Sequence, residues 1–111
     1  MTESKKLQGG STICAGAVHT AMLPLTIDQY YIGMPLSYNT TTSKYAYQSN
    51  ISNADAIYYA GERNITVAVD GQAIVGGVIY ETGLVSDSGD KLTITEANRK
   101  ALRAKGFYPV P

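Results

Sequence analysis

The chain has 111 residues, a length that suits one domain, and its nine basic and nine acidic residues give a net charge of zero. This balance argues against the basic surface that nucleic-acid binding requires. A single cysteine excludes an intramolecular disulfide framework. No run approaches the roughly 18 apolar residues of a membrane span. The sequence therefore predicts a small soluble domain with neither nucleic acid nor membrane as a direct partner.

Residues 1–23 show no sustained hydrophobic period and are rich in glycine, serine and threonine. Their apolar residues are too scattered to offset the entropy of ordering the segment. We therefore expect a flexible N-terminal arm over residues 1–23 and one β-rich domain over residues 24–111. If the arm binds a partner, its apolar side chains should make the contacts. These are Leu7, Ile13, Val18 and Met22.

The first half of the predicted domain reads as short strands joined by turns. Pro35 argues against a central strand, so residues 32–38 are interpreted as an extended lead-in segment. A polar turn over residues 39–43 follows, and two short strands are predicted over residues 44–48 and 56–60. Turn signals at this spacing favour a small barrel or sandwich.

The next segment predicts a β-hairpin. Residues 65–69 alternate apolar and small or polar side chains, as in a strand with one buried face. Asp70-Gly71 follows and is typical of a type I′ hairpin turn. Gly76-Gly77 would then interrupt the return strand with a bulge or a tight bend.

One helix is predicted, beginning after Thr95 as N-cap, spanning about 11 residues, and ending at Gly106 as the C′ residue. Leu102 is expected to be its main core residue. Arg99, Lys100 and Arg103 are expected to point outward, near the negative end of the helix dipole. The face expected to turn toward the core holds Ile94, Ala97, Ala101, Leu102 and Lys105. Residues 107–110 read as a final extended segment.

No pattern indicates catalysis, and we predict no catalytic, cofactor-binding or metal site. His19, the only histidine, has no residue at ligand spacing, and Cys14 has no local cluster of positive charge that would lower its pKa. Glu81, Asp87 and Asp90 form a loose acidic group, but their spacing does not fit an EF-hand. We interpret them as part of a solvated turn, so the chain is not expected to be an enzyme.

Tyrosine is the unusual feature, with nine residues against one Phe and no Trp. Tyr is enriched at protein–protein interfaces because it joins an apolar ring to a polar hydroxyl. Tyr45 and Tyr47 should share one face of a sheet, whereas Tyr58 and Tyr59 should point to opposite faces. One of the latter pair is expected in the core, and at least one tyrosine should be exposed. This composition favours a protein that functions in an assembly.

The order of features resembles that of the head decoration proteins of lambda-type tailed bacteriophages. After the loose arm come Gly33-Met34-Pro35-Leu36 and Ala56-Ile57-Tyr58-Tyr59-Ala60-Gly61. The hairpin signal at Asp70-Gly71 follows, and then Val78-Ile79-Tyr80-Glu81-Thr82-Gly83-Leu84. Last comes the helix from Thr95 to Gly106 with its apolar tail. The resemblance covers residues 30–111, and the arm matches only in character.

The resemblance implies a β-clip domain that binds the major capsid protein as a homotrimer at three-fold and quasi-three-fold positions. Such proteins stabilise the expanded capsid against the pressure of packaged DNA. It further implies a place on the outer surface of the virion after synthesis in the host cytoplasm, with an arm that pairs by strand addition. Two other interpretations remain open: another phage tail or adaptor component, and a small carbohydrate- or ligand-binding β module that uses exposed Tyr.

Overall fold

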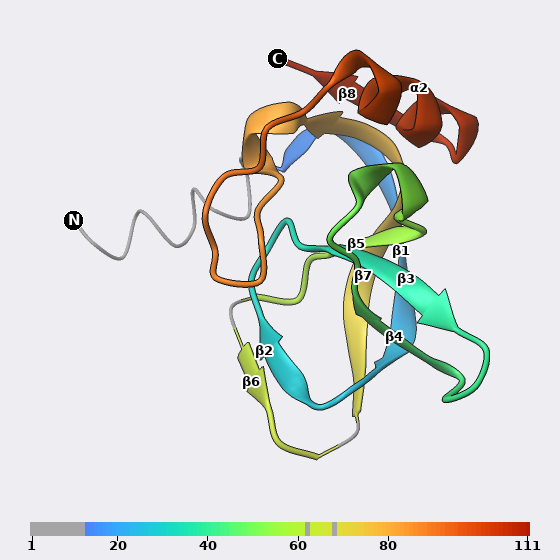
Figure 1. Ribbon diagram of the computed structural model, residues 1–111, viewed down its shortest axis with the longest axis vertical. Coiled ribbons are helices and arrows are strands. Elements are labelled where there is room, and N and C mark those ends of the chain that lie inside the picture. Colours follow the sequence, from blue (N-terminus) through green and yellow to red (C-terminus); the bar gives the residue numbers. More distant parts are fainter. Residues whose placement is uncertain (1–12, 62, 68) are drawn as a thin grey trace.

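The computed structural model describes residues 13–61, 63–67 and 69–111. It confirms a mainly β fold with an α-helix near the C-terminus (Figure 1). Along the chain the strands are β1 (Cys14–Leu25), β2 (Asp28–Tyr30), β3 (Pro35–Asn39), β4 (Lys44–Tyr47), β5 (Ala56–Tyr58), β6 (Arg63–Ile65), β7 (Val69–Tyr80) and β8 (Phe107–Val110). The helical elements are the 3-10 turns η1 (Ile51–Asn53) and η2 (Glu81–Gly83) and the helix α2 (Glu96–Ala104). No helix in the described part of the chain has the length and apolar character needed to cross a bilayer.

The main sheet closes on itself, as in a small barrel. Its strand order is β1-β4-β3-β5-β7-β8, and an additional pairing of β1 with β7 completes a ring. β1 and β7 run antiparallel from the pair Cys14–Ile79 to the pair Leu25–Val69. β8 lies outside this ring, parallel to the second half of β7. β2 and β6 form a separate two-stranded sheet, which lies at the lower left in Figure 1.

Two hydrophobic cores lie on opposite faces of β5 and β7. In β5, Ala56 and Tyr58 contribute to one core and Ile57 to the other. In β7, the neighbours Ala73 and Ile74 divide in the same way. Because successive side chains of a strand point to opposite faces, the two cores lie on opposite sides of these strands.

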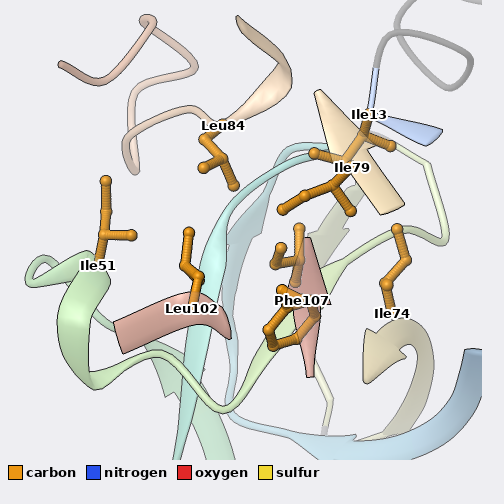
Figure 2. Packing of buried hydrophobic residues seen from close by; sticks show 8 residues of the cluster. Ile13, Ile51, Ile74, Ile79, Leu84, Leu102 and Phe107 are labelled. Carbon is orange, nitrogen blue, oxygen red and sulfur yellow. The ribbon is translucent and has the colours of Figure 1, made fainter. Parts of the chain in front are cut away.

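We call them the inner and the outer core. The inner core draws on the ring and on β2 and β6, whereas η1, α2, β8 and the segment after β7 contribute to the outer core (Figure 2). The inner core consists of Leu25, Tyr30, Met34, Leu36, Ala56, Tyr58, Ile65 and Ala73. The outer core consists of Ile13, Ile51, Ile57, Ile74, Ile79, Leu84, Leu102 and Phe107.

The predicted boundary of the arm is wrong. Residues 14–23 belong to β1, a 12-residue strand paired with β7. Their small side chains contribute little apolar surface, but their main chain is held by the β7 ladder, which local sequence does not reveal. The prediction for residues 1–12 lies outside the described residues.

The predicted hairpin turn at Asp70-Gly71 is also wrong, because both residues lie inside β7. Gly71 pairs with Leu23 of β1. A Cβ atom at Gly71 would lie 2.5 Å from Leu25 Cδ1 and 3.5 Å from the ring of Tyr58. Glycine at this position therefore makes room for two inner-core side chains, which is a packing role and not a turn.

The predicted irregularity at Gly76-Gly77 is confirmed. Gly77 has a φ of 117°, and the register between β1 and β7 shifts on both sides of Val18 and His19, the partners of Gly77 and Gly76. Beyond this point β7 pairs with β8 on its other edge. The bulge therefore lies where β7 passes from the ring to the outer core.

β3 lies between β4 and β5, so it occupies an internal position in the sheet that the presence of Pro35 argued against. Pro35 is the first residue of β3, where proline is tolerated. Its carbonyl accepts a hydrogen bond from the N–H of Gln48 at 2.9 Å. Proline restricts only the strand's first position, and the remainder of β3 pairs normally.

The helix begins as predicted and is shorter than predicted, with nine residues. Thr95 accepts a hydrogen bond from the N–H of Asn98, whose side chain in turn accepts one from the N–H of Thr95, forming a capping box. Leu102 is 1% exposed and Gly106 has a φ of 93°, as its C′ position requires. Ala97 is exposed, contrary to its predicted place on the core face.

Candidate partner-binding surface

The ion pair between Arg99 and Glu81 is a structural contact. Within the described residues, no group of three or more His, Cys, Asp or Glu side chains is placed to hold a metal ion. Arg99, predicted to point outward, instead binds both carboxylate oxygens of Glu81, with Nη2–Oε1 at 3.0 Å. This contact crosses from α2 to η2 and holds the pKa of the Glu81 carboxyl below its usual value. Glu81 is therefore a structural ion-pair partner, separate from the acidic turn at Asp87 and Asp90.

The segment of Asp87 and Asp90 is a hydrogen-bonded turn, as interpreted from sequence. The N–H of Ser86 donates to the carbonyl of Asp90 at 2.7 Å, and Ser88 Oγ donates to the Asp90 carboxylate at 3.4 Å. Gly89 has a φ of 85° at the bend. These bonds engage Ser86, Ser88 and Asp90 with one another within the loop.

Cys14 is half-buried, and its side chain forms a hydrogen bond with the side chain of Tyr59. Their side-chain hydrogen bond, the nearby thiol and burial together raise the pKa of Tyr59. The thiol therefore packs at the edge of the outer core.

The structure divides the four residues predicted to bind a partner. Ile13 is fully buried in the outer core, so its predicted partner contact is wrong, because the side chain fills space beside Ile79 (Figure 2). Val18 is half-buried against the same core. Met22 is 62% exposed and is therefore available for a contact. Leu7 lies outside the described residues.

The tyrosines separate into packed and exposed groups. Tyr45 and Tyr47 share one face, as predicted, and both pack against the inner core, whereas Tyr58 and Tyr59 contact different cores. The exposed tyrosines are Tyr38, Tyr80 and Tyr108, at 44%, 37% and 55% exposure. Sequence reasoning did not single these out, although Tyr80 and Tyr108 each follow a buried residue in a strand, which is the pattern that could have identified them.

Tyr80 and Tyr108 lie on one face of the β7–β8 pair. The register pairs Val78 with Tyr108 and Tyr80 with Val110, so the two rings are diagonal neighbours. The N–H of Tyr80 donates to the carbonyl of Ile13 at 3.0 Å. This uncharged surface therefore adjoins the point where the described chain begins.

β1 has one free edge over most of its length. Toward β4 the strand makes a single pairing, Leu25 with Tyr45, among the residues that the structure describes. From Thr20 to Leu25 its pairing with β7 on the other side is regular. None of the 12 residues of β1 is Asp, Glu, Lys or Arg. Natural proteins protect exposed edges with charges, prolines, bulges or short strands. In β1 the register shifts lie before Thr20, and from Thr20 to Leu25 the strand has only Pro24, next to its end.

The direction of the main-chain groups on this edge follows from one hydrogen bond. The N–H of Thr26 donates to the carbonyl of Tyr45 at 3.0 Å, so Thr26 points its main chain toward β4. Main-chain groups of successive strand residues point to alternate sides. Met22 and Thr20 therefore present N–H and C=O groups along the free edge, whereas Pro24 lies where the pairing with β4 begins.

The edge of β8 differs from that of β1. β8 has four residues, includes Pro109, and pairs with β7 alone among the described strands. Proline removes a main-chain donor, and a short strand offers few hydrogen bonds to another chain. Of these two edges, β1 is the one able to accept an added strand.

A shallow hollow of about 220 Å³ lies at the Leu25 end of β1. It is lined by Pro24, Leu25, Lys44, Val69 and Asp70. These residues come from three neighbouring strands, since Pro24 pairs with Asp70 and Leu25 pairs with both Val69 and Tyr45. The hollow therefore lies directly beyond the free edge.

Comparison with known proteins assigns no family: no family model and no curated protein matches the chain.

Proposed function

We propose that the chain is a head decoration protein of tailed bacteriophages. In this function it binds the major capsid protein on the outside of the expanded shell as a homotrimer, and thereby stabilises the shell. The proposal rests on the order of sequence features between residues 30 and 111 together with the free edge of β1. The free edge of β1 is the main structural support for the proposal, because a decoration protein needs a long contact surface and no catalytic group.

A strand of the capsid protein that pairs with Thr20 and Met22 would bind main-chain groups that have no strand partner among the described residues. Strand addition obtains its affinity from such main-chain hydrogen bonds. The exposed thioether of Met22 would lie against the added strand and contribute apolar burial. The absence of charge on β1 fits a contact of this kind.

Tyr80 and Tyr108 supply a second apolar surface at the other end of β1. Tyrosine is favoured at the centres of interfaces, where charged residues are depleted. A shell subunit needs contacts in more than one direction, to its own copies and to the lattice beneath. Two separate uncharged surfaces on one small domain support this arrangement.

The test is co-sedimentation of the full chain with empty expanded shells of a phage whose genome encodes it. Phage tails from the same source provide the comparison sample. We expect binding to shells and none to tails, and trimers on negative-stain images of decorated shells. Binding to tails in place of shells would contradict the proposal and favour a tail or adaptor role.

The same assay also tests the nature of the contact. Raising sodium chloride from about 0.1 M to about 1 M shortens the Debye length from about 10 Å to about 3 Å. A main-chain and apolar contact should change in affinity by less than about tenfold over this range, which corresponds to about 1.4 kcal/mol. A steeper loss would mean that charged residues, such as Arg103 and Lys100 on α2, carry the attachment.

A further inference from the structure

We propose that the hollow beside β1 receives one side chain of the docked partner segment, and that this side chain is amphipathic, with tyrosine as the best fit. The inference rests on the proposed function, because it assigns specificity to the strand contact. In strand addition the main chain supplies affinity, and pockets for individual side chains supply specificity. The hollow is the feature of β1 placed to do this.

The position of the hollow fixes which part of the partner reaches it. Leu25 is the residue at which β4 takes over the free side of β1. A strand added along Thr20 and Met22 must therefore end, or turn away, at Lys44, the first residue of β4. Its last paired residue lies at the mouth of the hollow.

The lining suits a group that is apolar with a polar end. Pro24, Leu25 and Val69 give apolar walls, while Lys44 offers a donor and Asp70 an acceptor. Neither Lys44 nor Asp70 takes part in an ion pair among the described side chains. A phenol places its ring against the apolar walls, and its hydroxyl can accept from the ammonium or donate to the carboxylate. A charged side chain would meet a like charge on one flank.

The size of the hollow also favours one side chain over a free ligand. Sites for small-molecule ligands usually occupy about 300–1,000 Å³. The hollow, at about 220 Å³, is smaller and open to solvent. A side chain delivered by a docked strand needs no deep enclosure, since the strand pairing holds it in place.

The first experiment uses p-cresol as a probe of the tyrosine side chain, with toluene for comparison. Amide signals of the full chain are followed by NMR during titration. We expect p-cresol to shift the signals of Leu25, Lys44, Val69 and Asp70 in a saturable manner. Toluene should bind more weakly, because it lacks the hydroxyl.

Three variants sharpen this test. Val69→Phe fills the hollow and should abolish the shifts, whereas Val67→Phe, at a side chain that is 66% exposed, is the matched control and should retain them. Asp70→Asn, at an exposed residue outside the cores, should weaken p-cresol several-fold and leave toluene unchanged. Because Val69 touches the inner core, Asp70→Asn tests the proposal even if Val69→Phe fails to fold.

The second experiment measures how tightly the same variants bind expanded shells. We expect Val69→Phe to bind shells at least about tenfold more weakly than Val67→Phe, a difference of about 1.4 kcal/mol. Equal shell binding by the two variants, or unchanged p-cresol binding in Val69→Phe and Asp70→Asn, would overturn the assignment of the hollow and leave the proposed function intact. If the unmodified chain fails to bind shells, the proposed function fails and this assignment fails with it.

Discussion

Strands surround the inner core, whereas the outer core is covered largely by segments that follow β7 in the chain. β5 and β7 separate the two and contribute side chains to both. The ring around the inner core is closed by the pairing of β1 with β7. The cover of the outer core depends on Leu102, Phe107 and a few polar links, among them Arg99 to Glu81 and Lys105 to Asp55 at 2.9 Å.

The two cores therefore depend on different kinds of contact. Main-chain ladders hold the walls of the inner core in place, so a lost side chain there leaves the ring hydrogen-bonded. The outer core has α2 as part of its cover, and tertiary contacts hold a short helix in place because an isolated helix of this length is marginal. We therefore expect local opening to begin at α2 and β8.

Gly33 links β5 to the segment that follows η2, and changing it should have the largest effect. Its N–H donates to the carbonyl of Tyr58 at 2.9 Å, and its carbonyl accepts from the N–H of Val85 at 3.1 Å. Its φ is 98°, and a Cβ there would overlap the carbonyl oxygen of Gly83. Gly33→Ala should destabilise the fold by about 4 kcal/mol, through backbone strain and overpacking. Denaturant titration measures this, and Gly61→Ala, with a φ of 106° and an open surrounding, is the control for strain alone.

Truncating one leucine in each core should separate their behaviour. Leu102→Ala and Leu36→Ala should each cost about 2–5 kcal/mol, as expected for buried leucines. Hydrogen exchange should distinguish them: Leu102→Ala should expose α2 and β8 first, and Leu36→Ala should lower protection throughout. Arg103→Ala, at the exposed face of α2, should cost about 0.5 kcal/mol or less. Equal exchange patterns in the two leucine variants would contradict the division into two cores.

Acid should weaken the cover of the outer core. The pKa of Glu81 in the folded protein lies below the ordinary value of 4.5, so the folded state binds this proton less readily than the unfolded state. The contribution to stability is therefore complete above the unfolded value and is lost as pH falls through the folded one. We expect the free energy of unfolding to fall less steeply below pH 4.5 in Glu81→Gln than in the unmodified chain. Parallel pH curves would contradict this role of the ion pair.

Local signals predicted part of the fold well. The helix at Thr95, the bulge at Gly76-Gly77 and the final strand follow from capping, glycine pairs and apolar pattern, which act over a few residues. The prediction of a hairpin at Asp70-Gly71 is wrong because a long-range contact, and not the local sequence, determines the backbone conformation there. The space that Leu25 and Tyr58 need at Gly71 cannot be read from neighbouring residues.

The candidate surface was predicted only in part. Met22 was identified as a contact residue, but as part of a flexible arm, and Ile13 was assigned to the same surface although it is buried. Small residues such as those of β1 resemble a linker in sequence, because main-chain pairing leaves no pattern in side chains. The free edge and the hollow arise where β1 meets β4 and β7, and strand order of this kind cannot be inferred from residue spacing.

Attachment through the edge of β1 is tested by comparing Met22→Pro with Met22→Ala in binding to expanded shells. Proline at this position removes an N–H that faces the free edge and leaves the ladder to β7 complete, so the fold should persist. We predict that Met22→Pro abolishes shell binding while keeping its thermal midpoint near that of Met22→Ala, which should lose only the apolar contact of the thioether. Shell binding by a folded Met22→Pro variant that equals that of Met22→Ala would contradict attachment through the edge of β1.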